Sequence, residues 1–240
     1  MIPKVIHYCW FGGAPLPEKE RKCMESWKKF APDYNIVRWD ESNYDVHKNQ
    51  YMSDAYDRKK WGFVPDYARF DIIYKYGGIY LDTDVELVKS LDELLSNDAY
   101  MGFEGGKWIN GGIGFGAVAG NPLIKGLRDM YDDIKFVKDD GGLDTTPSPH
   151  YITAYLVEHG LIRDDSMQVL EGSLRIYPTE YFAAKDYDTN KINITENTIS
   201  IHQYSATWNT PKEKLVKTVK RLVGVKAFNH IIDIKHKVIR

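Results

Sequence analysis

Residues 65–84 read PDYARFDIIYKYGGIYLDTD, a helix pattern followed by a glycine pair, a short apolar run and two carboxylates. Pro65 suits the first turn of a helix, and the glycine pair suits its end. The apolar residues 79–81 predict a buried strand, and Asp82 and Asp84 follow it directly. Ligands of open α/β sheets collect at the carboxyl ends of strands, where paired acids need a cation or a proton to compensate them. We therefore expect the chemistry at these two aspartates.

Strand and helix patterns alternate along the rest of the chain. Strands are predicted at 5–10, 35–39, 79–81, 85–88, 99–103, 167–171 and 198–204, and helices at 18–30, 54–61, 65–77, 91–95, 122–136 and 150–159. This alternation favours an α/β fold, a single Rossmann-like, mostly parallel sheet flanked by helices. The 240 residues have room for one large domain, expected at 1–210, with a helical tail at 211–240. The polar, turn-rich residues 137–149 predict a mobile loop.

Composition limits the class of protein. Hydrophobic residues make up 43% of the chain, enough for a large core. Cys9 and Cys23 are the only cysteines, and without a Cys/His cluster they indicate neither a disulfide scaffold nor a zinc site. The first residues lack the apolar run of a signal peptide, and no run is long enough to cross a bilayer. We expect a cytoplasmic protein with no nucleic-acid partner.

The net charge of −2 hides an uneven distribution. Residues 211–240 contain nine Lys/Arg and two acidic residues, whereas residues 1–210 have an excess of acidic side chains. Apolar residues recur at helical spacing among these lysines. Such a segment suits an amphipathic helix on an anionic membrane surface, and packing of the segment on the body of the protein is the equal alternative.

Asp66 and Arg69 are three residues apart and so share one face of the predicted helix at 65–77. A local ion pair at the start of the helix explains them in isolation. Because this helix leads directly into the strand before Asp82, both side chains are also candidates for the same pocket. For Asp82 and Asp84, the alternative to function is a solvated turn. Carboxylates together with phosphate oxygens are the ligands that Mg²⁺ and Mn²⁺ prefer.

Three segments together resemble glycosyltransferase family 32, sugar transferases that carry a DXD motif. The middle segment is Asp66…Arg69 with the run 76–84, which contains the motif, and the opening run 2–12 is similar to the start of the family. The set His202…Ser205…Trp208 is similar to its closing segment. The family includes fungal initiating mannosyltransferases and bacterial capsular-polysaccharide enzymes. Over a shorter span, the chain is also similar to the catalytic domains of bacterial glucosylating toxins.

The resemblance implies a GT-A fold, a nucleotide-sugar donor and a divalent cation held by the DXD acids. It implies that Asp84 binds the metal directly and that Asp82 contacts the ribose or metal-bound water, so both are expected to be catalytic. His202 is a further candidate metal ligand, because Mn²⁺ accepts imidazole more readily than Mg²⁺ does. A hydrogen-bonded strand histidine is the alternative. The expected cofactor is Mn²⁺ or Mg²⁺.

The resemblance also suggests a set of donor-binding residues. They are Trp10, Asp66, Arg69, Tyr80, Asn110 and Trp208. Trp10 is a candidate to stack on a uracil base, and Asp66 and Arg69 to hold the donor sugar or ribose. Asn110 precedes two glycines, so a role in a turn is the alternative to a contact with the sugar. Trp208 either closes over the donor or is a hydrophobic anchor.

The function expected from this resemblance is metal-dependent transfer of a hexose from a nucleotide sugar, expected to be UDP-linked. The acceptor is a saccharide or lipid-linked saccharide of a cell-surface polysaccharide such as a capsule, with retention of configuration. This predicts a cytoplasmic enzyme that is peripheral on the inner face of the membrane. One alternative is a haloacid-dehalogenase-type phosphatase with Asp82 as nucleophile and Asp84 as acid/base. Another is an inactive sugar-nucleotide-binding or scaffold protein.

Overall fold

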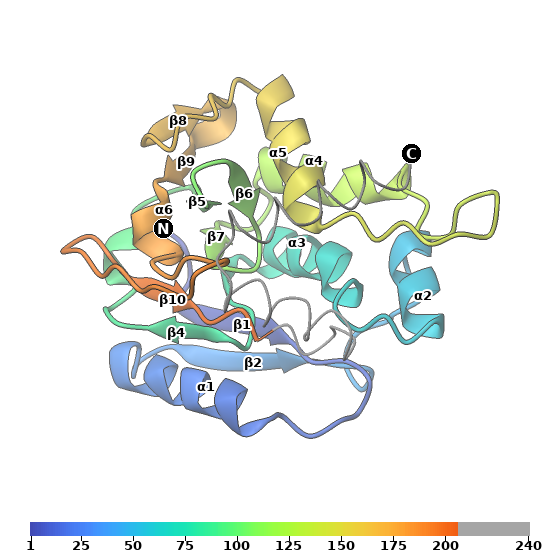
Figure 1. Ribbon diagram of the computed structural model, residues 1–240, viewed down its shortest axis with the longest axis horizontal. Helices are drawn as coiled ribbons and strands as arrows, with labels where there is room; N and C mark the ends of the chain where they lie inside the picture. The colour runs from blue at the N-terminus through green and yellow to red at the C-terminus, as the bar shows by residue number, and fades with distance from the viewer. Residues whose placement is uncertain (206–240) are drawn as a thin grey trace, which may run out of the picture.

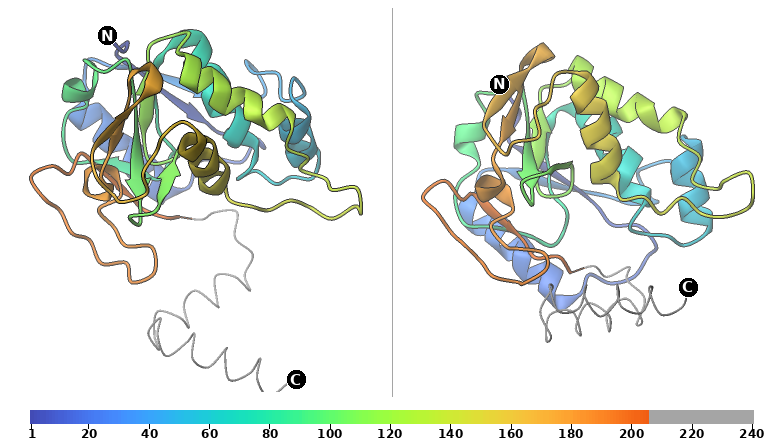
Figure 2. Two further views of the ribbon diagram at one scale, coloured as in Figure 1. Left: turned by 90° about the horizontal axis from the view of Figure 1, so that it is seen from above. Right: turned by 45° about the horizontal axis from the view of Figure 1, so that its top comes forward.

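A computed structural model describes residues 1–205, and residues 206–240 lie outside the described part of the chain. It shows an eight-stranded sheet with helices on both faces and a second, two-stranded sheet beside it (Figures 1 and 2). Within residues 1–205, no helix is long and apolar enough to span a membrane.

The strands are β1 (Val5–Cys9), β2 (Asn35–Trp39), β3 (Gly78–Tyr80), β4 (Val85–Leu87), β5 (Ala99–Glu104), β6 (Trp108–Asn110), β7 (Phe115–Ala117), β8 (Gln168–Leu170), β9 (Leu174–Tyr177) and β10 (Ser200–His202). The α-helices are α1 (Glu18–Phe30), α2 (Gln50–Asp57), α3 (Val64–Tyr76), α4 (Pro122–Asp129), α5 (Ser148–Glu158) and α6 (Thr179–Phe182). Three short 3₁₀ helices are η1 (Asp92–Leu94), η2 (Met130–Asp132) and η3 (Glu171–Ser173).

The large sheet has the order β2-β1-β3-β7-β5-β9-β8, with β6 also paired to β5. Pairings β1–β2, β1–β3 and β5–β9 are parallel. Pairings β3–β7, β5–β6, β5–β7 and β8–β9 are antiparallel, so the sheet is mixed. The small sheet is the antiparallel pair β4–β10. The α/β class predicted from the alternating pattern is confirmed. Among the strands in antiparallel pairs, β6, β7 and β9 were not predicted, whereas β4, β8 and β10 lie in segments predicted as strands.

Alternate residues of the central strands face two separate cores. Tyr80 packs with Phe70 of α3, Phe115 and their neighbours on one face. Ile79 and Leu81 pack on the other face with Trp27 of α1 and residues of β4 and its neighbours. The strand that leads to Asp82 is therefore fixed from both sides.

The glycine pair after α3 is required by its geometry. Gly77 and Gly78 both have positive φ, at 66° and 102°, a region that side chains with a Cβ disfavour. A Cβ on Gly78 would also approach Nε2 of His7 and the carbonyl oxygen of Val5 at 2.9 Å. The chain therefore reverses from α3 into β3 without a longer loop, which places the start of α3 near the end of β3.

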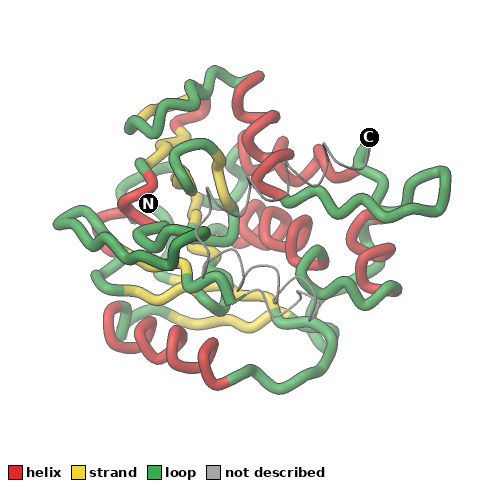
Figure 3. The backbone as a smooth tube through the Cα atoms, viewed as in Figure 1, coloured by secondary structure: helices red, strands yellow, loops and turns green. Residues whose placement is uncertain are grey.

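Several elements differ from those predicted. α2 begins at Gln50 rather than near 54, because the Asn49 side chain accepts a hydrogen bond from the Met52 backbone N–H and caps the helix. The helix predicted at 122–136 ends at Asp129 and continues as a 3₁₀ turn. The strands at 108–110, 115–117 and 174–177 and the helix at 179–182 were not predicted, since short strands carry little periodicity. Residues 183–199 form a long excursion without a helix or strand (Figure 3).

Candidate active site

Three distant parts of the chain meet beyond the carboxyl end of β3. Asp82 and Asp84 follow β3 directly. β1 runs parallel to β3, with His7 opposite Tyr80, so Trp10 just beyond β1 reaches the same edge. β10 pairs with β4 and places His202 opposite Val85, next to Asp84. The site predicted from the sequence is thus assembled from the opening segment, the DXD segment and the closing segment.

The first half of the site, the Asp84 cluster, consists of Asp84, Glu104, His202 and Ser205. His202 Nε2 lies 3.5 Å from Asp84 Oδ1, and His202 Nδ1 lies 2.9 Å from Glu104 Oε1. The Ser205 backbone N–H donates to Asp84 Oδ2 at 2.8 Å. Both ring nitrogens of His202 therefore face carboxylates, and Glu104 fixes the orientation of the ring.

The charges of this cluster compensate one another. Burial by itself would raise the pKa of Asp84, but His202 and the Ser205 N–H lower it to about 2. Burial by itself would lower the pKa of His202, but Asp84 and Glu104 raise it to about 10. Asp84 is therefore held as a carboxylate at neutral pH, the form that binds a cation.

The second half, the Arg69 cluster, consists of Asp66, Arg69, Tyr80 and Asp82. Arg69 Nη2 lies 3.1 Å from Asp66 Oδ1 and 3.6 Å from Asp82 Oδ1. The Tyr80 hydroxyl donates to Asp82 Oδ1 at 3.0 Å, and the guanidinium of Arg69 lies over the Tyr80 ring at 5.1 Å. The prediction that Asp66 and Arg69 lie beside Asp82 is confirmed.

Exposure divides the members of this second cluster. The side chains of Asp66 and Arg69 are each 5% exposed, whereas that of Asp82 is 30% exposed. Tyr80 is completely buried, so it holds Asp82 in place and offers no open face for stacking. Asp82 is the carboxylate of this cluster that a ligand reaches.

Burial dominates the ionisation of the Arg69 cluster. It raises the pKa of Asp66 to about 6, with Arg69 opposing the shift, and it raises the pKa of Asp82 against the same opposition. The side chains of Tyr51 and Ser148 hydrogen-bond to Asp66. Sequence reasoning missed both, because they come from α2 and α5 and no local pattern connects them to Asp66.

Residues 110–116, a glycine-rich segment, lie in direct contact with Asp82. The Asp82 backbone N–H donates to the Gly112 carbonyl at 3.0 Å, and a Cβ on Gly112 would collide with Asp82 Oδ2. A Cβ on Gly111 would come within 3.3 Å of the Arg69 side chain. Asn110 Oδ1 accepts a hydrogen bond from the Gly112 N–H at 2.7 Å, and Asn110 is buried. Asn110 thus occupies the turn position that was the alternative to a direct sugar contact.

Of the two tryptophans expected to bind the donor, Trp10 lies within residues 1–205. Trp10 is partly buried, and its Nε1–H donates to the Ala14 carbonyl at 2.6 Å, which fixes the indole at the edge of the site. Trp208 lies outside the described residues, as does the tail at 211–240.

The donor atoms around Asp84 suit a divalent cation. Among residues 1–205, no three His, Cys, Asp or Glu side chains form a ready-made metal cluster. The Ser205 hydroxyl, however, is buried and has no hydrogen-bond partner among those same residues, although its backbone N–H contacts Asp84. Asp84, His202 and Ser205 offer a carboxylate, an imidazole and a hydroxyl, with Asp82 exposed nearby. An oxygen-rich set with one imidazole suits Mn²⁺.

A family of known proteins matches the segment that supplies Asp82 and Asp84. Residues 17–101 match the family described as "Glycosyltransferase sugar-binding region containing DXD motif". The matched segment contains Asp66, Arg69, Asp82 and Asp84. This confirms the resemblance to DXD sugar transferases of the family 32 type and favours a transferase over the phosphatase alternative.

Two fungal proteins are among its relatives. Inositol phosphoceramide mannosyltransferase 3 of Schizosaccharomyces pombe is 35% identical over 138 residues, covering 54% of this chain and 37% of the relative. Mannosyl phosphorylinositol ceramide synthase SUR1 of Saccharomyces cerevisiae is 24% identical over 240 residues, covering 97% and 56%. The chain therefore spans only a third to a little over half of these relatives.

A solved glycosyltransferase involved in the glycosylation of the major capsid of PBCV-1 is similar in outline. Its TM-score is 0.46 at 14% identity, over 85% of this chain and 95% of that one.

Proposed function

We propose that this protein is a metal-dependent hexosyltransferase that uses a nucleotide-sugar donor. The observation that carries the proposal is the meeting of Asp82, Asp84, His202 and the Ser205 hydroxyl beyond the end of β3, the hydroxyl having no hydrogen-bond partner within residues 1–205. This arrangement lies within and beside a segment that matches a sugar-binding region of glycosyltransferases. The hexose named for the fungal relatives is mannose, so GDP-linked as well as UDP-linked sugars are candidate donors.

On binding of the cation, the His202 imidazolium would lose its Nε2 proton, so that Asp84, His202 and Ser205 would hold the cation with Glu104 orienting the ring. A bound divalent cation neutralises the diphosphate, so that the nucleoside diphosphate leaves with its charge compensated. Asp82, held by Tyr80 and Arg69, would accept hydrogen bonds from the ribose or from water on the cation. Trp10, at the edge of the site, would lie against the base.

We propose that transfer retains configuration by attack on the same face. The anomeric carbon–oxygen bond to the diphosphate breaks, and a bond to the acceptor oxygen forms on the same face. The acceptor proton passes to the departing diphosphate oxygen. Asp82, the accessible carboxylate of the Arg69 cluster, is ion-paired with Arg69, which lowers its nucleophilicity. Positioning then supplies most of the catalysis.

The test is incubation of the protein with Mn²⁺ and a panel of UDP- and GDP-linked hexoses, following nucleoside diphosphate release and calorimetric binding. We expect metal-dependent binding of at least one donor, lost when EDTA removes the cation. Hydrolysis of simple phosphoesters without binding of any nucleotide sugar would contradict the proposal. The configuration of the product, read by NMR, decides between retention and inversion.

We further propose that the acceptor is a saccharide or lipid-linked saccharide of a cell-surface polysaccharide, met at the inner face of the membrane. The fungal relatives are named for a ceramide lipid, and residues 211–240 carry nine basic and two acidic side chains. Deletion of residues 211–240 should abolish co-sedimentation with phosphatidylserine vesicles. Unchanged co-sedimentation would remove the membrane from the proposal.

A further inference from the structure

A second concave site lies away from Asp82 and Asp84, at the opposite end of the β4–β10 ribbon. Asp84 and His202 flank one end of the ribbon, where Val85 pairs with His202. At the other end, the Lys89 backbone N–H bonds to the Ile199 carbonyl. The three-residue strand β4, about 10 Å long at 3.3 Å per residue, runs between Asp84 and the segment of Lys89, and the pocket lining shares no residue with the Asp84 cluster. The second site is therefore not part of the Asp84 cluster.

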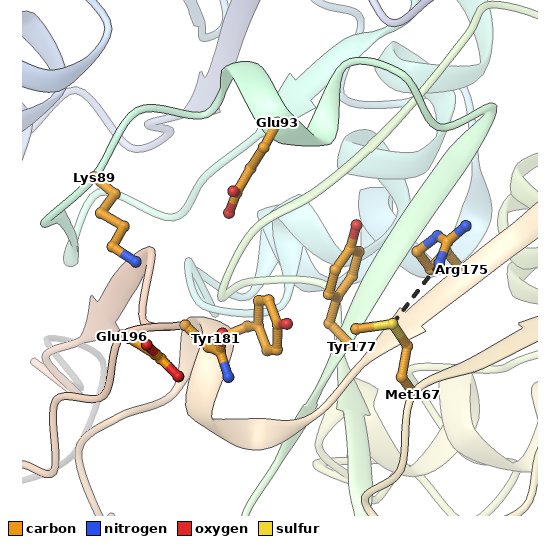
Figure 4. A pocket seen from close by; sticks show the side chains of 8 residues that line it. Lys89, Glu93, Met167, Arg175, Tyr177, Tyr181 and Glu196 are labelled. Carbon is orange, nitrogen blue, oxygen red and sulfur yellow. Dashed lines mark hydrogen bonds between the residues drawn. The ribbon is translucent and has the colours of Figure 1, made fainter.

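This site is a pocket of about 290 Å³ (Figure 4). That volume is near the lower limit for small-molecule sites, about 300 Å³. Its lining includes Lys89, Glu93, Arg175, Tyr177, Tyr181 and Glu196. They come from the segment after β4, from η1, from β9 and α6, and from the long 183–199 excursion, so only the folded chain assembles the pocket.

One wall of the pocket is held rigid by its own hydrogen bonds. Asn97 Oδ1 accepts from Arg175 Nε at 2.9 Å, and Asn97 Nδ2 donates to the Tyr177 hydroxyl at 3.1 Å. The ring of Tyr177 lies 4.8 Å from that of Tyr181, at 52°. The Tyr181 ring and a fixed guanidinium are thus presented together beside the largely buried Tyr177, which lowers the side-chain entropy that the protein loses when a ligand binds.

The opposite wall is charged and uncommitted. Lys89, Glu93 and Glu196 are exposed, and no hydrogen bond or ion pair of their side chains is formed with any other residue from 1 to 205. In Figure 4, the carboxylate of Glu93 lies above Tyr177 and Tyr181, and Glu196 lies below it. These groups are free to donate and accept hydrogen bonds to a ligand.

The chemistry of the lining selects the class of ligand. Two basic and two acidic side chains give no net charge, so the pocket favours neither a phosphate nor a cation. A ring with an apolar face and several hydroxyls matches tyrosine faces bordered by both hydrogen-bond donors and acceptors. We propose that this pocket binds a saccharide unit, as an acceptor site remote from the site of transfer. The acceptor role rests on the proposed function, whereas the binding of a saccharide does not.

Binding of free sugars tests the proposal without donor or metal. The full chain is titrated with mannose, glucose, galactose and their disaccharides and tetrasaccharides, with sulfate as an anionic probe, by saturation-transfer NMR and calorimetry. Tyr181→Ala removes an aromatic face and Glu196→Gln removes a charged acceptor. Each should weaken binding of a saccharide about tenfold, the loss of one good contact. Glu25→Gln, on an exposed face of α1, should bind as the wild type does, and so should Asp84→Asn.

Four results would overturn the proposal, of which the first three concern the pocket alone. These three are no binding of any saccharide, equal binding by both pocket variants and the wild type, and sulfate binding in place of saccharide. If the sugars bind but Asp84→Asn abolishes that binding, the transfer site and not this pocket is the saccharide site. Glu196→Gln keeps the test valid if Tyr181→Ala does not fold. In turnover assays, the pocket variants should raise KM for the acceptor and leave KM for the donor unchanged. If the wild type shows no donor-dependent activity, the proposed function is refuted, while the result on saccharide binding stands.

Discussion

Asp82 and Asp84 are separated by one residue, yet their surroundings shift their pKa values in opposite directions. Burial raises the pKa of Asp82 in spite of Arg69. The Asp84 side chain is less exposed, at 13% against 30% for Asp82, but the His202 imidazolium and the Ser205 N–H lower the pKa of Asp84 to about 2. The difference shows that the two acids of the motif are not equivalent ligands.

The surroundings of Asp82 and Asp84 suit the two carboxylates to different roles. Asp84 is held ionised by cationic and N–H partners, and the Ser205 that donates this N–H also carries a hydroxyl that is unpaired among residues 1–205, which suits direct contact with a cation. Asp82 belongs to a network that begins at the buried Asp66–Arg69 pair and includes Tyr80. That network fixes the position of one exposed carboxylate, which suits contact with the donor.

The largest effect is expected from Asp84→Asn. Loss of the charge removes the main attraction for the cation, so nucleoside diphosphate release should fall on the order of 10³-fold, as when a key electrostatic group is removed. Calorimetry should show no Mn²⁺-dependent donor binding while the thermal unfolding curve stays cooperative. Asp98→Asn, at an exposed aspartate outside the site, is the matched control. Equal activity of Asp84→Asn and Asp98→Asn would contradict the assignment of Asp84.

A smaller effect is expected from Gly112→Ala, which tests the Asp82 side alone. A Cβ at this position collides with Asp82 Oδ2, so the carboxylate must move. A displacement of about 1 Å at a positioning group costs on the order of 10²-fold in kcat/KM. Mn²⁺ binding, measured without donor, should remain. Gly142→Ala, at an exposed position without positive φ where only the flexible Asp140 side chain lies near the added Cβ, controls for the change of residue type. Loss of Mn²⁺ binding in Gly112→Ala would mean that the two acids are not separable.

Glu104→Gln should have a weaker effect, through His202. Glu104 Oε1 orients the imidazole at 2.9 Å, and loss of such an outer partner lowers metal affinity or activity by roughly 10- to 100-fold. Calorimetric Mn²⁺ affinity is the measurement, with Glu25→Gln as the control. An unchanged affinity would show that the His202 ring does not depend on Glu104.

The smallest effect concerns stability alone and extends the contrast to two histidines. His202, paired with carboxylates, has a raised pKa, whereas burial lowers that of His7 to about 4. Trp39 Nε1–H donates to His7 Nδ1 at 3.0 Å, and His7 Nε2 lies 3.0 Å from the Gly77 carbonyl. Trp is a donor only, so Nδ1 must be an unprotonated acceptor and the ring must be neutral.

Unfolding releases this constraint, because the ordinary pKa of histidine is 6.5. Between that value and about 4, the unfolded chain binds a proton that the folded chain excludes, so stability falls as the pH falls through this window. The loss by pH 4 is about 3 kcal/mol. Urea unfolding of wild type and His7→Gln at several pH values measures it. The variant should be less stable at pH 7.5 but lose less on acidification; equal slopes would contradict the prediction.

Much of the Arg69 cluster was predictable from local spacing. Asp66 and Arg69 are one turn apart on a helix that leads through two glycines into the strand before Asp82, so few conformations keep them apart. His202 was suggested only by a resemblance, and Glu104, Ser148 and Tyr51 were missed. Glu104 is the last residue of β5, a strand predicted up to residue 103, but nothing in its neighbourhood indicates a partner 98 residues away.

By itself, the sequence determined the unit from α3 to Asp84, because helix spacing, the positive φ of the glycine pair and a short apolar strand are all local. It also indicated where two carboxylates emerge from the sheet. Only the tertiary structure decided which carboxylate meets a cationic partner and which rests on a buried arginine network. The physical reason is that pKa shifts and metal geometry depend on groups within a few ångströms in space. Here those groups come from β5, from β10 and from the residues just beyond β10, up to 121 residues from Asp84.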